Sequence, residues 1–170
     1  MLKCIGIDPG LADTGVGVVT GLGLDIDSYS FGAIQTSKSL SLPERLDMIF
    51  SKLLTVLKDE KPDLMIVEDV FSLEKYPKSG ITLGKVTGVI LLAGFRSGVP
   101  VVEIPVREAK KILTGNGNAD KEQLEKAVRH LLRHSERIQP DHASDALALA
   151  VIGQYRYENH HAGHNLSRLA

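Results

Sequence analysis

The opening segment, from Ile5 to Val19, constrains the fold more than any other part of the chain. A short apolar run ends at Asp8, a tight turn containing Pro9 and Gly10 follows, and a second β-branched run begins at Gly15. This pattern predicts a β-hairpin with Asp8 at the C-terminal end of its first strand. Strand ends open onto loops, where ligands and metals bind, but an Asp before Pro is also an ordinary turn-former. The segment alone leaves both interpretations open.

The composition limits the class of protein. A chain of 170 residues has the size of one domain with a substantial core. Its net charge is −1, so any DNA-binding surface must be a local patch rather than a global basic field. The single cysteine, Cys4, forms no internal disulfide and suits a reducing cytoplasm. Because no apolar run reaches about 18 residues and no signal peptide precedes the first strand, we expect a cytoplasmic protein with no membrane contact.

The first third of the chain predicts a β-meander followed by a helix. Its three antiparallel strands are expected over Leu2–Asp8, Gly15–Thr20 and Leu24–Thr36. Ser41, with Glu44 three residues later, is typical of a helix N-terminus. Apolar residues then recur at helical spacing to about Glu60.

A second buried strand is predicted to end at another acidic residue. The run Leu64–Val67 is continuously apolar, as in a strand covered on both faces, and it ends at Glu68. After a predicted loop over 72–79, a helix is expected over Ile81–Arg96, and a short strand over Val99–Ile104. Gly84 and Gly88 lie on one face of that helix and would let another backbone approach closely.

Three helices and a tail are predicted for the remainder. Val106–Leu113 forms a short helix, and Asn118 caps a second that runs through Leu132. The last helix, Asp141–Tyr157, consists almost wholly of small and apolar residues and should pack tightly against a sheet. The polar, aperiodic segment 158–170 is expected to be a disordered tail, which leaves residues 1–157 as the folded domain.

The start of the last helix carries three residues that can bind metal: Asp141, His142 and Asp145. Residues three or four apart share a helix face, so either Asp141 or His142 can point to the same place as Asp145. Asp141 also suits the positive end of the helix dipole, and we favour that role for it. Asp145 lies among alanines and leucines, where an unpaired carboxylate is costly, so it needs a cation or strong donors.

Four motifs together resemble one family. They are GIDPG followed by TGVGV at the start, IVEDVF at 66–71, KK-x3-GNGNADK at 110–121 and DHASDALALA at 141–150. In this order they resemble the RuvC family of Holliday junction resolvases from about Leu2 to Ile152. The resemblance implies an α/β protein of the ribonuclease H-like fold. Its mixed five-stranded sheet would have the first three strands antiparallel and helices on both faces.

The resemblance also implies a function. RuvC proteins act as homodimers that nick two symmetry-related strands of a four-way DNA junction with divalent metal, during recombination and repair. The RuvA–RuvB branch-migration complex is the implied partner. Carried over by position, the metal ligands and catalytic residues fall on Asp8, Glu68, His142 and Asp145. Many members have Asp where this chain has His142 and others have His, so His142 is matched in preference to Asp141.

The residue types suit this chemistry. Phosphodiester hydrolysis needs an activated water and relief of charge on the phosphate and the leaving oxygen, which two hard cations can provide. Mg²⁺ prefers oxygen ligands, whereas an imidazole suits Mn²⁺ somewhat better. We expect two ions per site, Mg²⁺ or Mn²⁺. Asp8 would bridge both ions, Glu68 would bind one of them, and His142 and Asp145 the other.

The DNA contacts follow mainly from the resemblance. Phe71 matches an aromatic residue that stacks on a base near the cleavage point, although a core aromatic is the alternative. Lys110 and Lys121 match lysines near the scissile phosphates, and Arg107 and Lys111 are candidate phosphate contacts. Solvated helix lysines are the plainer interpretation of Lys110 and Lys121.

Two other functions remain open at this stage. An actin-like ATPase has a similar first hairpin on a related fold, but it needs two such domains and a second phosphate loop. A RuvC-like protein that binds branched DNA without cutting is the other alternative. The presence of ligand-competent residues at all four metal positions argues against it.

Overall fold

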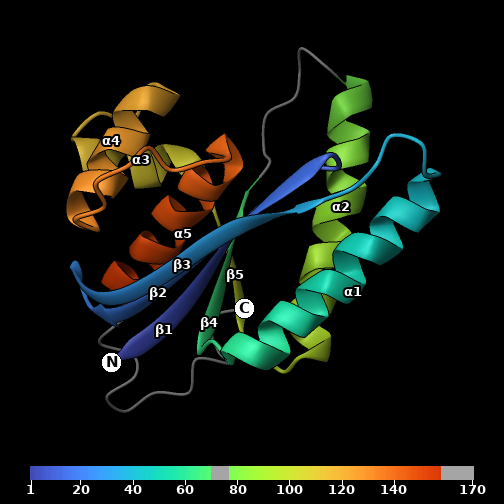
Figure 1. The fold of residues 1–170 in the computed structure, drawn as a ribbon, viewed down its shortest axis with the longest axis horizontal. Coiled ribbons are helices and arrows are strands. Elements are labelled where there is room, and N and C mark those ends of the chain that lie inside the picture. The colour runs from blue at the N-terminus through green and yellow to red at the C-terminus, as the bar shows by residue number, and fades with distance from the viewer. Residues whose placement is uncertain (70–76, 158–170) are drawn as a thin grey trace.

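The computed structural model describes residues 1–69 and 77–157, although it leaves the side chains of residues 77 and 78 undescribed. A five-stranded sheet with the order β3-β2-β1-β4-β5 forms its centre (Figure 1). Its strands are β1 (Leu2–Asp8), β2 (Asp13–Leu22), β3 (Asp25–Gln35), β4 (Leu64–Glu68) and β5 (Val101–Ile104). The first three are antiparallel, and β4 and β5 run parallel to β1. The predicted mixed sheet with helices on both faces is confirmed.

The helices form one layer on each face of the sheet. They are α1 (Leu42–Glu60), α2 (Pro77–Arg96), α3 (Val106–Thr114), α4 (Lys121–Leu131) and α5 (Asp141–Tyr157). Figure 1 shows α1 and α2 on one face and α3, α4 and α5 on the other, with α5 next to the strands. Successive side chains along a strand point to opposite faces of the sheet, so each strand contributes to the cores beneath both helix layers. In β1, Cys4 joins the core beneath α5, whereas Ile5 and Ile7 join the core beneath α1 and α2.

Helix α5 lies very close to the strands because glycines face it. A Cβ atom added at Gly15 would lie 2.0 Å from the carbonyl oxygen of His142. One added at Gly6 would lie 1.9 Å from the carbonyl oxygen of Ala146. Neither distance is compatible with a side chain, so these glycines set how closely the first turns of α5 approach β1 and β2. The prediction that this small-residue helix packs against a sheet is confirmed.

The N-termini of α1 and α4 can be compared with the caps predicted for them. The Glu44 carboxylate accepts the backbone N–H of Ser41 at 2.8 Å, so the predicted start of α1 is confirmed. The predicted cap of α4 was wrong, because Asp120 caps this helix. Its carboxylate accepts the backbone N–H of Gln123 at 2.8 Å, and the Gln123 side chain accepts the Asp120 N–H at 3.0 Å. Asn118 lies two residues earlier, and its backbone N–H donates to Asn116.

Several boundaries differ from those expected. Helix α2 begins at Pro77, one turn before the predicted start, so part of the predicted loop is helical; proline is well tolerated in a first turn. Strand β2 is longer than predicted at both ends, and β5 begins at Val101. The predicted tail, 158–170, lies outside the described residues. Within the parts of the chain that the structure describes, no helix is long and apolar enough to cross a membrane.

Candidate active site

Two adjacent strands bring the first two predicted ligands together. Asp8 is the last residue of β1 and Glu68 the last of β4, and these strands pair in parallel. Parallel neighbours present their C-terminal ends at one edge of the sheet, where sites in open α/β folds lie. The two carboxyl groups lie close enough to interact, and a side-chain hydrogen bond to Asp8 is one of the causes that raise the pKa of Glu68.

Helix α5 adds the other two predicted ligands. His142 Nδ1 lies 2.5 Å from Asp8 Oδ2, and the imidazole N–H donates to the carboxylate. Asp145, one turn later, is close enough to Asp8 and His142 to interact electrostatically with both, and it is buried. All four predicted residues therefore lie in one cluster at the sheet edge.

The acidic groups in this cluster oppose one another's ionisation. Burial, the hydrogen bond to Asp8 and the nearby charges of Asp8 and Asp145 raise the pKa of Glu68 to about 9. Burial and the charge of Asp8 raise the pKa of Asp145 as well. The hydrogen bond to Asp8 raises the pKa of His142, although burial acts in the opposite direction. The cluster therefore favours the protonated forms of these groups, and a bound cation would compete with those protons.

Lys121 supplies a nearby positive charge. As the first residue of α4, it places Nζ 3.5 Å from Asp145 Oδ2. Its side chain is 65% exposed, so the pair is open to solvent and weak. Its charge nevertheless lowers the pKa of both Asp145 and Glu68. The lysine predicted to approach a phosphate thus lies at the rim of the carboxylate cluster.

The donor set fits a hard divalent cation. Three carboxyl groups and one imidazole are ligands that Mg²⁺ or Mn²⁺ accepts, and their mutual repulsion is the kind that a cation relieves. Among residues 1–69 and 77–157, no three His, Cys, Asp or Glu side chains converge on one point as they stand. The hydrogen bond between His142 and Asp8 engages one potential ligand atom of each residue. Coordination through those two atoms would require the bond to break.

Asp141 stands apart from the cluster. Its side chain is 61% exposed, and its Oδ1 atom lies 3.7 Å from Arg137 Nη2. The neighbouring His142 makes the contact with Asp8 instead. This arrangement agrees with the interpretation of Asp141 as a helix-start residue.

The other predicted DNA contacts are placed only in part. Arg107, Lys110 and Lys111 lie on α3, which follows β5, and the end of β5 pairs with Glu68. Arg107 and Lys111 are exposed and Lys110 is half-buried. Phe71 lies outside the described residues. Helix α3 therefore begins beside the cluster, with two exposed cations.

Two features of the site were missed by the sequence reasoning. Thr14 is fully buried, and its hydroxyl donates to the carbonyl of Gly10 at 2.7 Å, which ties down the turn after Asp8. Gly15 leaves room for the backbone of His142. A short Thr-Gly pair opening a strand was the available signal, but only the position of α5 shows what it serves.

The fold and the cluster define a class. A mixed five-stranded sheet with carboxyl groups at the ends of β1 and β4, and a His and an Asp on the helix across them, is typical of ribonuclease H-like nucleases. The family model for the crossover junction endodeoxyribonuclease RuvC matches residues 4–153. The chain belongs to the RuvC family of crossover junction endodeoxyribonucleases, the Holliday junction resolvases of recombination and repair, as its motifs indicated.

Individual relatives agree over most of the chain. The RuvC of Brevibacillus brevis is 39% identical over 91% of this chain and 93% of its own length. That of Carboxydothermus hydrogenoformans is 40% identical over 89% and 95%. The structure of T. thermophilus RuvC in complex with a Holliday junction substrate is 31% identical, covers 94% of this chain and 96% of its own, and has a TM-score of 0.86. A yeast mitochondrial Holliday junction resolvase, at 10% identity and a TM-score of 0.63, shares the fold.

Proposed function

We propose that this chain resolves four-way DNA junctions by paired, symmetric, metal-dependent nicks. The observation that carries the proposal is the single cluster of Asp8, Glu68, His142 and Asp145, in which burial and the neighbouring charges raise the pKa values of Glu68 and Asp145. The likeness to T. thermophilus RuvC, whose structure holds a Holliday junction substrate, supports four-way DNA as the substrate. We assign the nuclease domain to residues 1–157.

Each residue of the cluster has a separate task in this proposal. Asp8 contacts both Glu68 and His142, so it is placed to hold two ions at once, with Glu68 on one side and His142 and Asp145 on the other. Two Mg²⁺ or Mn²⁺ ions bound there would supply an activated water and neutralise charge on the phosphate and the leaving oxygen. Lys121, exposed at the rim, would then bind a phosphate oxygen near the cleaved bond.

We further propose that the active unit is a two-fold homodimer joined through α2. Three large apolar side chains on this helix are exposed: Ile81 (63%), Leu92 (46%) and Phe95 (79%). Gly84 and Gly88 lie on the same face, and no atom comes within 4 Å of a Cβ built at either. The close backbone approach that these glycines permit is therefore not made within the described chain, and a second copy would supply it. Two sites per dimer match the two strands to be nicked.

The remaining DNA contacts and partners are proposed from the family resemblance and from the position of α3. Arg107, Lys110 and Lys111 on α3 would bind phosphates beside the site, and Phe71 would stack on a base. The family resemblance supports the RuvA–RuvB complex as the partner that delivers the junction. The single buried thiol of Cys4, whose pKa burial raises well above its usual value, suits a reducing cytoplasm.

A direct experiment tests the main proposal. The purified chain is incubated with a synthetic four-way junction and with linear duplex, each with and without Mg²⁺. We expect two symmetric nicks in the junction with Mg²⁺, and no cutting of duplex or of either substrate without metal. Junction binding without cutting under all metal conditions would favour the non-cleaving alternative. ATP binding in place of DNA cutting would favour an actin-like ATPase.

A further inference from the structure

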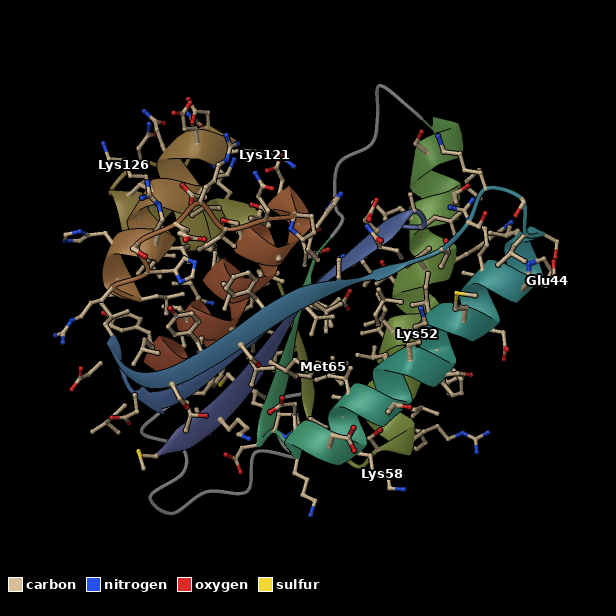
Figure 2. The ribbon with its side chains drawn as sticks, viewed as in Figure 1. Glu44, Lys52, Lys58, Met65, Lys121 and Lys126 are labelled. Carbon is tan, nitrogen blue, oxygen red and sulfur yellow. The ribbon has the colours of Figure 1, made fainter. Side chains whose placement is uncertain are left out.

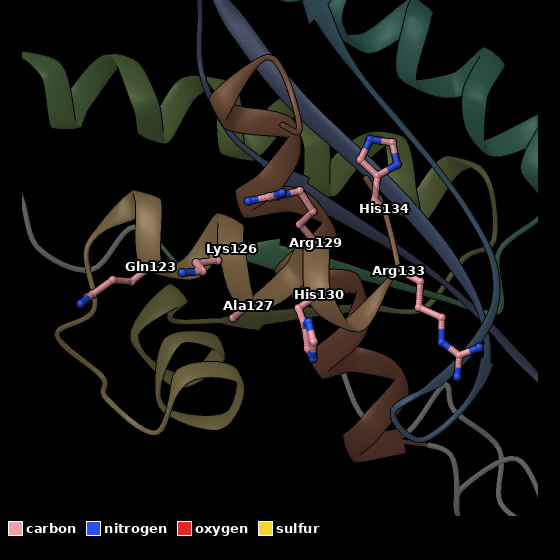
Figure 3. A pocket seen from close by; sticks show the side chains of 7 residues that line it. All are labelled: Gln123, Lys126, Ala127, Arg129, His130, Arg133 and His134. Carbon is pink, nitrogen blue, oxygen red and sulfur yellow. The ribbon is translucent and has the colours of Figure 1, made fainter. Parts of the chain in front are cut away.

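A basic groove lies on the side of α4 that faces away from the core. Its volume is about 600 Å³, and its lining includes the cations Lys126, Arg129 and Arg133 together with His130 and His134, which Figure 3 shows projecting from α4 and the segment after it. No acidic side chain of the described chain lines it. The opposite side of the helix, with Leu124 and Val128, is fully buried. We call this surface the α4 groove.

The positive charge of the α4 groove is largely uncompensated. Lys126 and Arg133 are exposed, and neither forms an ion pair with another described residue. Arg129 differs, because its Nε atom lies 3.1 Å from Glu125 Oε1. In a chain whose net charge is −1, such a concentration on one helix is a local feature. A local patch of Lys and Arg is the electrostatic footprint of a polyanion site.

The backbone at Arg133 adds an independent observation. After α4, the N–H of Arg133 donates to the carbonyl of His130 at 3.1 Å and that of His134 to Arg129 at 3.0 Å, which is a Schellman helix end. Arg133 occupies its left-handed position, with φ of 53°, which Gly or Asn usually takes. The chain thus keeps a long cationic side chain where the backbone favours glycine, and that side chain lines the groove.

The same helix links the groove to the candidate active site. Helix α4 begins at Lys121, beside Asp145, and Figure 2 shows Lys121 and Lys126 along the same helix. Helix α4 rises about 15 Å along its axis from Lys121 to Leu131, and Arg133 lies just beyond its end. At about 3.4 Å per base pair, the separation of Lys121 and Arg133 corresponds to about five base pairs of duplex.

We propose that the α4 groove binds the phosphate backbone of a junction arm about five base pairs from the cleaved bond. The inference rests on the proposed function for its substrate, the four-way junction. DNA is favoured over an acidic protein segment because the groove continues the line of basic residues that starts at the cluster. The contacts would be independent of sequence and would hold the arm in register with the site.

The first test compares two variants that share a backbone change. Arg133→Gly removes a cation from a left-handed position in the groove. Lys61→Gly is the matched control, because Lys61 is also left-handed, with φ of 48°, and ends α1, remote from α4. Binding of a fluorescent four-way junction is measured by anisotropy in EDTA at several salt concentrations. Lys126→Gln tests a second groove cation whose backbone is helical.

We expect Arg133→Gly and Lys126→Gln each to weaken junction binding about 5- to 10-fold near 0.1 M salt, with a salt slope lower by about 1. Lys61→Gly should bind like the wild type. The melting temperature of Arg133→Gly should equal or exceed that of the wild type, since glycine relieves the left-handed backbone. Weakened binding without loss of fold would thus separate a DNA contact from a structural role. Unchanged affinity and slope in both groove variants would overturn the proposal and leave an acidic protein as the occupant to test.

The second test locates the contact on the DNA. Single neutral methylphosphonate linkages are placed along one arm at increasing distance from the crossover. A linkage about five base pairs out should weaken binding of the wild type but not of Arg133→Gly, because the two changes remove the same contact. Equal sensitivity of both proteins at every position would reject the proposal. Junction binding is measured without metal, so the groove proposal can be confirmed even if the chain does not cut. Conversely, cutting by the wild type can be confirmed even if the groove variants bind normally.

Discussion

His142 Nδ1 and Asp8 Oδ2 lie 2.5 Å apart, although 134 positions separate the two residues in the chain. One belongs to the first turn of α5 and the other to the end of β1. The bond joins the sheet edge to the helix that covers it. It also engages atoms that we propose as metal ligands. A metal ion, protons and this hydrogen bond therefore compete for the same two atoms.

The cluster should be required for cutting but not for binding. Asp8→Asn and Glu68→Gln keep the size of each side chain but remove a negative charge, so we expect nicking of a four-way junction to fall about 100-fold or more. Junction affinity should stay within about 2-fold of the wild type, because phosphate contacts do not need these carboxylates. Gel-based nicking and anisotropy measure the two quantities. A parallel loss of affinity in both variants would contradict the assignment.

The choice of His142 over Asp141 is tested by a pair of neighbours. His142→Ala should lose most nicking activity, whereas Asp141→Ala should lose little, because Asp141 is exposed and faces Arg137. The reverse result would make Asp141 the ligand. Each variant is assayed at saturating junction and Mg²⁺.

The pH dependence of nicking should depend on His142. Imidazole must be neutral to bind metal, and the bond to Asp8 raises the pKa of His142. As the pH is lowered, activity should therefore begin to fall at a pH higher than about 6.5, the ordinary pKa of His, and added metal should partly restore it. His142→Asp should stay active to lower pH and shift the metal preference toward Mg²⁺. A pH–rate profile that is the same in the wild type and His142→Asp would contradict this.

The stability of the metal-free protein should fall as the pH rises. The pKa values of Glu68, His142 and Asp145 are all raised in the folded state, so folding favours the protonated forms. Their stabilisation is present at low pH and is lost as the pH rises; for Glu68 the window runs from its ordinary pKa of 4.5 to about 9.

Melting curves in EDTA test this directly. Near pH 8, Glu68→Gln should melt a few degrees higher than the wild type, because the uncharged glutamine takes up no proton on folding, whereas Glu68 must. Glu122→Gln, at an exposed position on α4, is the control and should change little. Mg²⁺ or Mn²⁺ should raise the melting temperature of the wild type more at high pH than at low pH. A melting temperature of Glu68→Gln below that of the wild type throughout would refute the argument.

Gly15 should be needed for both stability and cutting. Gly15→Ala places a methyl group 2.0 Å from the carbonyl oxygen of His142, so α5 must move. Overpacking of this kind costs about 1–3 kcal/mol, or a fall of several degrees in melting temperature. Nicking should fall at least 10-fold, roughly, because the shift moves His142 away from Asp8. Gly32→Ala on β3 is the matched control, since no atom lies within 4 Å of its Cβ, and it should be near neutral.

The proposed dimer can be disrupted at one exposed position. Leu92→Glu puts a charge in the middle of the apolar face of α2 and should raise the dimer dissociation constant about 100-fold or more, because burying an unpaired charge is costly. The control is Leu22→Glu, which changes another exposed leucine, on β2, and should stay dimeric. Sedimentation measures both. A monomeric wild type with full paired nicking would disprove the dimer.

The sequence by itself determined most of the local structure. Strands β1 and β4, with Asp8 and Glu68 at their ends, follow from apolar runs closed by an acid. Helix α1 follows from its cap and helical spacing, and α5 from a run of small and apolar residues. These signals are local, because each depends on residues within a few positions of one another. Motif order then indicated the family and, by position, the four residues of the cluster.

Only the tertiary structure decided which groups touch. The bond between His142 and Asp8, the raised pKa of Glu68 and the approach of Lys121 to Asp145 all join elements distant in the chain. The cap of α4 was misjudged because Asn118 and Asp120 are both acceptable caps, and the packed backbone selects between them. The α4 groove likewise has no local signature, because lysines and arginines on an amphipathic helix are ordinary until packing shows that they line a groove without an acidic side chain.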